Sequence, residues 1–156
     1  MATIRPFKGF RPTPELCSKV AALPYDVMTS KEAREMVKND PYSFLHVDRA
    51  EIDLPENVDI YSKEVYEKAA SNLNKMIEDK VLIQDSKPVF YIYSLTMNGR
   101  EQIGLVVCTS IDEYLNNTIK KHEFTRADKE QDRINHVDYC NANTGPIFLT
   151  YKNQKT

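Results

Sequence analysis

The chain has 156 residues and a formal net charge of −2, from 21 Lys and Arg against 23 Asp and Glu. This length and charge suit one domain of ordinary solubility and argue against a protein that binds polyanions over its whole surface. Apolar residues make up 41% of the chain and charged residues 28%, which excludes the disordered, collagen-like and coiled-coil classes. The longest apolar runs are too short for a membrane span, and no signal-peptide core follows the N-terminus, so we expect a cytoplasmic protein.

Residues 1–42 are rich in proline and predict an ordered, winding arm rather than a linker. Within it, Thr13-Pro14-Glu15 is typical of an N-cap followed by proline at the first helical position, which predicts a short helix that ends before Pro24. Thr29-Ser30-Lys31-Glu32 has the capping-box pattern and predicts a second helix of about ten residues.

The middle of the chain contains the longest predicted element. Residues 43–47 form an apolar run that predicts a short buried strand containing His46, and residues 51–57 predict an acidic loop. From 59 to 80, apolar or small residues recur at the spacing of an amphipathic helix; they are Tyr61, Val65, Ala69, Leu73, Met76 and Ile77.

The surest β element follows this helix. Residues 89–97 are dense in β-branched and aromatic residues, and Asn98-Gly99 is the dipeptide typical of a type I′ turn. Residues 100–110 should therefore return as the second, antiparallel strand of a hairpin.

The C-terminal third contains a turn, a helix and a strand-like run. Residues 111–115 predict one helical turn, and Thr125 is expected to cap a helix from about 126 to 142 that is broken by Gly145-Pro146. Residues 147–151 resemble a strand. The whole chain thus predicts a single α+β domain with a mixed or antiparallel sheet and three to four helices.

The densest cluster of ionisable residues lies between 120 and 136. Arg126, Lys129 and Arg133 stand at i, i+3 and i+7, which places three cations on one helical face. Lys120 and Lys121 come just before them. With the free N–H groups of the helix N-terminus, these cations could hold a phosphate. The alternative is a solvated helix whose opposite charges neutralise one another.

His122 and Glu123 place an imidazole beside a carboxylate, a pairing used for proton transfer near neutral pH. The helix that follows has few large apolar residues, and a helix that polar often lines a site. Adjacent side chains can also point apart, so the pair is a candidate for catalysis on sequence grounds alone.

Metal binding is the weaker hypothesis. Asp132, His136 and Cys140 recur at i, i+4 and i+8, but no second pair of ligands has recognisable spacing. The three cysteines are an odd number with wide spacing, which favours neither a disulfide framework nor a zinc ribbon. We therefore predict no metal site. The chain has no P-loop, dinucleotide-binding fingerprint, nucleophile elbow or HExxH motif, and its cofactors stay unknown.

Five separated blocks, in order, resemble the domain-of-unknown-function family 1015. The blocks are Ile4-Arg5-Pro6-Phe7-Lys8-Gly9; Leu23-Pro24-Tyr25-Asp26-Val27; Asn39-Asp40-Pro41-Tyr42-Ser43-Phe44-Leu45-His46-Val47; Ile119-Lys120-Lys121-His122-Glu123 with Thr125-Arg126, Lys129-Glu130 and Asp132-Arg133; and Asn141-Ala142-Asn143-Thr144-Gly145-Pro146. The resemblance extends over nearly the whole chain.

The resemblance implies a bacterial or archaeal cytoplasmic protein well over twice this length. The C-terminal half of such proteins carries an Asp-Gly-His-His-Arg box similar to the phosphate-handling box of the ParB and sulfiredoxin superfamily, which includes free-serine kinases. This chain has no His-His pair. The resemblance therefore implies the N-terminal part of a longer protein.

The implied function is that of the N-terminal domain of a phosphate- or nucleotide-dependent small-molecule enzyme, with kinase-like transfer. Lys120, Lys121, Arg126 and Arg133 would hold phosphate oxygens, and His122 and Glu123 would position or deprotonate the acceptor. The main alternative is a non-catalytic ligand-binding or regulatory module, so the sequence leaves open whether the chain is an enzyme. A third hypothesis is a ParB-like nucleic-acid adaptor, which the net charge of −2 disfavours.

The expected partner is a small phosphorylated ligand or a nucleotide, and no membrane is expected. The strand-like residues 146–151 also allow a homodimer formed through a strand edge.

Overall fold

The computed structural model describes residues 2–121 and 125–151. Its helices are α1 (Cys17–Val20), α2 (Ser30–Val37), α3 (Leu45–Asp48), α4 (Lys63–Glu78), α5 (Ile111–Leu115) and α6 (Ala127–Cys140), with 3-10 helices η1 (Tyr25–Val27) and η2 (Ala50–Asp53). Its strands are β1 (Ile4–Arg5), β2 (Phe10–Pro12), β3 (Leu82–Gln84), β4 (Tyr91–Met97), β5 (Arg100–Val106) and β6 (Cys108–Thr109). The predicted α+β class is confirmed.

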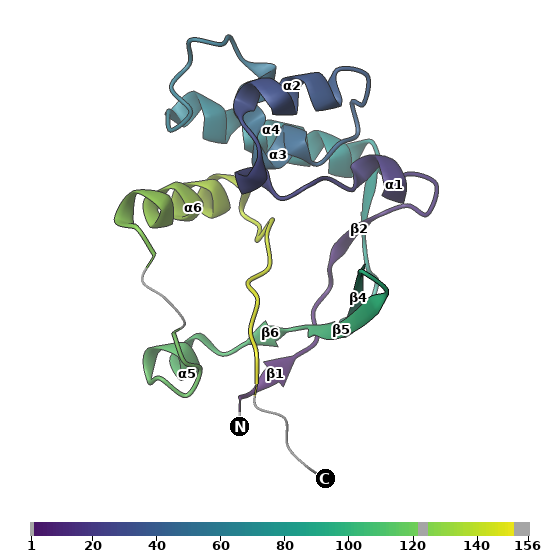
Figure 1. Cartoon of the computed structure of the whole chain (residues 1–156), viewed down its shortest axis with the longest axis vertical. Coiled ribbons are helices and arrows are strands. Elements are labelled where there is room, and N and C mark those ends of the chain that lie inside the picture. The colour runs from purple at the N-terminus through teal and green to yellow at the C-terminus, as the bar shows by residue number, and fades with distance from the viewer. Residues whose placement is uncertain (1, 122–124, 152–156) are drawn as a thin grey trace.

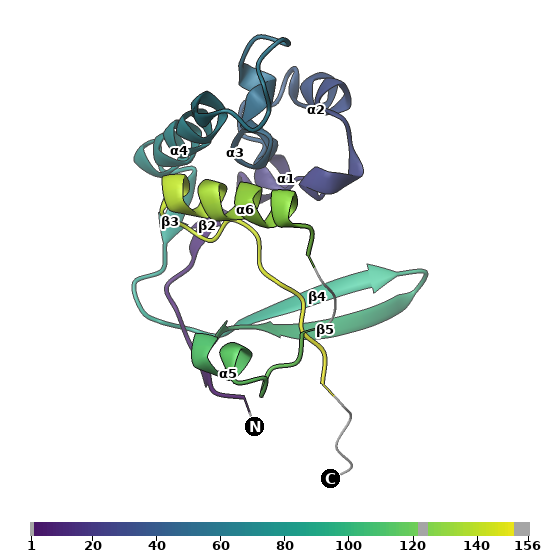
Figure 2. The same cartoon turned by 90° about the vertical axis from the view of Figure 1, so that its left-hand side faces the viewer.

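The helices and strands occupy different ends of the molecule. Helices α1 to α4 and α6 lie together at one end, while β1, β6, β4, β5 and α5 lie at the other (Figure 1). The strands form three two-stranded antiparallel sheets, β1–β6, β2–β3 and β4–β5, within the described residues. The β4–β5 hairpin projects away from the other elements (Figure 2).

The core is built on one face of α4. Val65, Ala69, Leu73 and Met76 are buried there and pack with residues of α1, α3, β3 and α6. This confirms the predicted amphipathic helix, which begins at Lys63 because residues 59–62 form a turn closed by a hydrogen bond from the Ser62 N–H to the Asp59 carbonyl. A smaller core cluster lies under α2.

Two local motifs form as their sequences predict. The Thr29 hydroxyl accepts a hydrogen bond from the Glu32 N–H while the Glu32 carboxylate accepts one from the Thr29 N–H, which completes the capping box of α2. Asn98 and Gly99 both take positive φ, 52° and 75°, and close the hairpin. The returning strand is divided, however, because β5 ends at Val106 and β6 pairs with β1.

Residues 43–47 do not form the predicted strand. Leu45 to Asp48 is a helix, α3, whose buried Leu45 and Val47 contact different core clusters. A short apolar run fits a buried helical turn as well as a strand, so periodicity could not separate them. The predicted acidic loop also differs, because residues 50–53 form η2 and Glu51 is buried.

The helix predicted in the C-terminal third is confirmed, but its predicted N-cap and the strand-like run after it are wrong. The N-cap residue of α6 is Arg126 and no side chain caps the helix, so Thr125 does not have that role. The helix itself forms close to its predicted bounds and ends at Cys140, because Asn141 takes the left-handed conformation, with φ 48°. Residues 147–151 form no strand, because no described strand pairs with them. No helix in the described part of the chain has the length and apolar character needed to cross a bilayer.

Candidate functional site

A cluster of charged and aromatic side chains forms where η1, the end of α3 and α6 meet. The guanidinium carbon of Arg133 lies 4.4 Å from the centre of the Tyr25 ring. Arg133 also donates from Nη2 to Asp132 Oδ2 at 2.9 Å, and the hydroxyl of Tyr66 donates to Asp132 Oδ1 at 2.9 Å. The Arg133 side chain is one-third exposed (33%), so a guanidinium held on two sides still faces solvent.

A second arginine holds Tyr25 by its backbone. Arg49 donates from Nη1 to the Tyr25 carbonyl at 3.2 Å and from Nη2 to the Ser30 hydroxyl at 2.9 Å. Ser30 in turn donates to Glu51 Oε1 at 2.8 Å. The Nε of Arg49 lies 2.9 Å from the same carboxylate oxygen, at ion-pair distance but outside hydrogen-bond geometry. Two guanidinium groups thus fix Tyr25, one on its ring and one on its carbonyl.

Asp48, the last residue of α3, has a carboxyl group whose protonation is perturbed by burial. Burial raises the pKa of Asp48, and the charges of His136 and Arg133 and the hydroxyl of Thr144 offset only part of that rise. Burial, with the neighbouring Asp48 carboxylate, also raises the pKa of the Cys140 thiol to about 11. With its pKa raised to about 11, this thiol stays protonated at neutral pH and is unreactive.

His136 lies in the interface between α6 and α3 and is 4% exposed. Its Nε2 lies 3.1 Å from the Val47 carbonyl, and its Nδ1 has no hydrogen-bond partner among the described residues. The three residues considered as metal ligands at i, i+4 and i+8 therefore have different neighbours. Asp132 contacts Tyr66, His136 contacts Val47, and Cys140 lies in the core. Over residues 2–121 and 125–151, no group of three His, Cys, Asp or Glu side chains is placed to hold a metal ion.

The structure brings the four predicted phosphate-binding cations to different neighbours. Lys120 is exposed, and Lys121 Nζ lies 4.9 Å above the ring of Tyr114 in α5. Arg126 is paired with Asp128, from Nη2 to Oδ2 at 2.7 Å. Only Arg133 belongs to the Tyr25 cluster.

The remaining sequence candidates fall elsewhere. His122 and Glu123 lie outside the described residues. Lys129, predicted on the same face as Arg126 and Arg133, donates to the Tyr61 hydroxyl at 2.7 Å. That hydrogen bond raises the pKa of Lys129.

His46 lies on α3 rather than in a strand, and its role is structural. Its Nδ1 is 2.9 Å from Asp53 Oδ1, and Asn72 donates both to Asp53 and to the His46 carbonyl. The hydrogen bond with Asp53 raises the pKa of His46. Burial pulls the pKa of Asp53 upward, but the hydrogen bonds and charge of His46 and the amide of Asn72 outweigh burial and hold it below its usual value.

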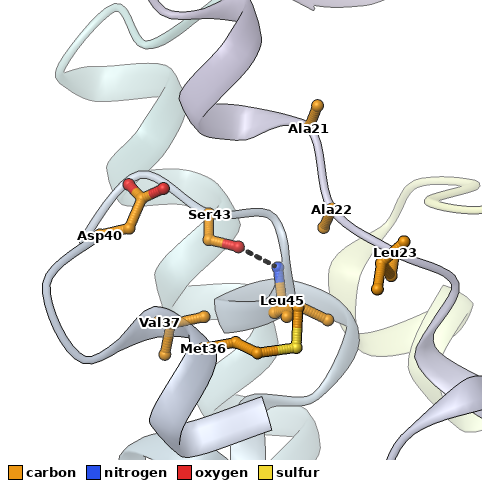
Figure 3. A pocket seen from close by; sticks show the side chains of 8 residues that line it. All are labelled: Ala21, Ala22, Leu23, Met36, Val37, Asp40, Ser43 and Leu45. Carbon is orange, nitrogen blue, oxygen red and sulfur yellow. Dashed lines mark hydrogen bonds between the residues drawn. The ribbon is translucent and has the colours of Figure 1, made fainter.

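A cavity of about 340 Å³ lies between residues 21–23, α2 and the start of α3 (Figure 3). Its lining is mostly apolar, with Asp40 and Ser43 as its polar side chains. Ser43 Oγ accepts a hydrogen bond from the Leu45 N–H, and Asp40 Oδ1 accepts one from the Tyr42 N–H. None of the four predicted phosphate-binding cations lines this cavity.

Sequence reasoning missed Asp48, Arg49 and Glu51 as members of the cluster. They follow the run 43–47, which was predicted as a strand; Asp48 and Arg49 were assigned to no element, and Glu51 was placed in the acidic loop 51–57. In the run Asp48-Arg49-Ala50-Glu51, charged residues of both signs surround one small residue. A prediction of helix for residues 45–53 would have placed this run beside a buried helical turn.

Residues in and around the Tyr25 cluster come from segments that also carry the resemblance to a known family. Tyr25, Arg133 and Thr144 come from three of the blocks that resemble a known family, and the family described as protein of unknown function, DUF1015, matches residues 4–156. The chain belongs to the DUF1015 family. Membership assigns no activity, because the function of the family is described as unknown. No curated protein and no solved structure matches the chain.

Proposed function

We propose that the chain binds a small phosphorylated ligand or a nucleotide, as part of a phosphate-dependent enzyme that acts on small molecules by kinase-like transfer. The observation that carries the proposal is the stacking of Arg133 on the Tyr25 ring, where residues of η1, α3 and α6 meet. The non-catalytic binding module remains the alternative, and the two make different predictions for transfer.

The surroundings of Arg133 favour an anionic ligand. Stacking on an aromatic ring restricts a guanidinium without using its donors. Arg133 uses Nε and Nη2 for Asp132, and among the described residues its Nη1 makes no hydrogen bond. A charged, oriented and partly exposed N–H group is suited to a phosphate oxygen.

The other proposed contacts come from the segment that leads into α6. Lys120, Lys121 and Arg126 would supply further positive charge, and the helix N-terminus adds a positive dipole end. Asp128 pairs with Arg126. A bound phosphate must therefore displace the Asp128 carboxylate from the Arg126 guanidinium or share that guanidinium with it. His122 and Glu123 would handle the proton of the acceptor.

A calorimetric titration with ATP, ADP and pyrophosphate tests the binding step. Replacing Arg126 and Arg133 together with alanine removes two charge-assisted contacts, each worth about 1.5–3 kcal/mol, so affinity should fall by at least about 100-fold. The matched control is Lys38→Ala with Lys75→Ala, which removes the same charge from exposed pairs with Glu35 and Asp79. Equal affinity in both double variants refutes the site.

Phosphate transfer from ATP or ADP to a panel of small hydroxyl compounds separates an enzyme from a binding module. We expect transfer to require the His-His-Arg box as well, so the assay compares this chain with a longer family member that has it. In that protein, glutamine at the histidine equivalent to His122 should lower turnover by about 10²–10⁴-fold and leave ligand affinity unchanged. Binding without transfer in either protein favours the non-catalytic module.

A further inference from the structure

The β4–β5 hairpin exposes an unusual amount of apolar surface for a protein in water. Six aliphatic or aromatic side chains on it are between 49% and 77% exposed; they are Ile92, Tyr93, Leu95, Met97, Ile103 and Leu105. Exposed apolar side chains gathered on one projecting element are typical of an interaction surface.

The exposed side chains lie on both faces of the ribbon. The register pairs Ile92 with Leu105 on one face and Tyr93 with Gly104 on the other. A two-stranded ribbon without support is marginal in water, and among the described residues no third strand pairs with it. An additional strand along one of its edges would supply the missing support.

The two edges of the hairpin differ in charge. Strand β4, Tyr-Ile-Tyr-Ser-Leu-Thr-Met, has no charged residue and no proline across its seven positions. Strand β5 begins with Arg100 and Glu101. Charged residues and proline are the features that keep an edge strand from pairing with another chain, and β4 has neither.

The register of the hairpin identifies which groups β4 offers. Met97 and Arg100 flank the two-residue turn and form a hydrogen-bonded pair, so the N–H and C=O groups of every second residue back from Met97 are used within the hairpin. The N–H and C=O groups of Ile92, Ser94 and Thr96 therefore point outward. These three residues are symmetric about Ser94.

We propose that a second copy of this chain pairs with β4 in antiparallel fashion about a two-fold axis at Ser94, forming a four-stranded sheet with the order β5–β4–β4–β5. In this register Ser94 meets the partner's Ser94, and Ile92 meets the partner's Thr96, so every outward group finds a complement. On one face, Tyr93 lies directly opposite the partner's Leu95, so an aromatic ring and an aliphatic side chain meet across the new strand pair. The same arrangement through β5 would place Glu101 against the partner's Leu105, which is why β4 is the pairing edge.

The mass of the chain in solution is the first test. Sedimentation at increasing concentration should show the mass double, with a Kd of about 100 μM or tighter. Ser94→Pro removes an outward N–H that the hairpin does not use and should abolish the dimer. Ser94→Val retains that N–H and should leave the dimer intact. A chain that stays monomeric up to about 1 mM, or a Ser94→Pro variant that still dimerises, overturns the proposal.

Disulfide cross-linking tests the register directly and does not depend on the proline variant folding. The background is Cys17→Ser with Cys108→Ser, which removes the exposed thiols and leaves Cys140 buried. Ser94→Cys should cross-link two copies on oxidation, because the Cα atoms of a hydrogen-bonded pair are about 5.5 Å apart, within the disulfide range.

The matched control for cross-linking is Thr96→Cys. Alone it should give no cross-link, whereas a mixture of Thr96→Cys and Ile92→Cys chains should give one. Cross-linking of Thr96→Cys with itself, or none with Ser94→Cys, refutes the pairing about Ser94.

Discussion

Replacing Arg49 with alanine should destabilise the fold more than the loss of any single surface charge. The Arg49 side chain is 16% exposed and that of Glu51 is 8% exposed, so the pair is largely removed from water. Without the guanidinium, Glu51 keeps a hydrogen bond from Ser30 but no cation, and the Tyr25 carbonyl loses its donor. Breaking a buried pair in this way costs about 3–5 kcal/mol, because one charge stays buried and uncompensated.

Urea unfolding at neutral pH, followed by circular dichroism, measures this loss as a fall in the transition midpoint. The double variant Arg49→Met with Glu51→Leu removes both charges and should recover most of the stability, since a hydrophobic replacement of a buried pair is commonly neutral or better. Lys38→Ala, from an exposed pair with Glu35, is the control and should cost at most about 1 kcal/mol.

The same substitution should weaken anion binding through Tyr25. When its backbone loses the Arg49 hydrogen bond, the ring that stacks on Arg133 is less restricted, so the bound state costs more entropy. If Arg49→Ala lowers the free energy of unfolding by less than about 1 kcal/mol, and the double variant recovers nothing, then Arg49 and Glu51 are solvated and Tyr25 is held by other contacts.

Three elements that local sequence determines were predicted correctly. The capping box at Thr29, the Asn98-Gly99 turn and the apolar stripe of α4 each depend on residues within one or two turns of one another. The physical causes are hydrogen bonds between near neighbours and the burial of one helical face, which a single sequence contains.

The Thr125 cap of α6 is a local error, whereas two other errors come from contacts between distant residues. Leu45 and Val47 are helical because the two side chains enter two different core clusters, and no local pattern distinguishes that arrangement from a strand. Residues 147–151 have strand-like composition but no strand to pair with among the described residues. Strand formation is a property of a pair of segments, so composition alone could not determine it.

The candidate site was predicted only in part for the same reason. Arg133 was found from helical spacing, but its stacking partner Tyr25 is more than 100 positions away in the sequence. Arg49 and Glu51 join the cluster through Ser30 and the Tyr25 carbonyl. Charge patterns identified the anion-binding candidates, whereas the groups that orient them depend on the tertiary fold.

Two further predictions follow from burial and protonation. Leu73→Ala should cost about 2–5 kcal/mol because Leu73 is 6% exposed in the main core, whereas Lys121→Ala should change the free energy of unfolding by at most about 0.5 kcal/mol; equal losses in urea titrations would contradict these placements. The second concerns His46 and Asp53. The folded-state pKa of His46 is raised, so its contribution is complete below its unfolded value of about 6.5 and disappears as the pH rises through the folded value. The folded-state pKa of Asp53 is lowered, so its contribution is present above about pH 4 and disappears as the pH falls through its folded value. The pair therefore stabilises most between about pH 4 and 6.5, and His46→Gln should cost more at about pH 5 than at about pH 8.5. The test is the free energy of unfolding of the unmodified chain and of His46→Gln at each of the two pH values. An equal cost of the substitution at the two pH values would mean that protonated His46 gains nothing from Asp53.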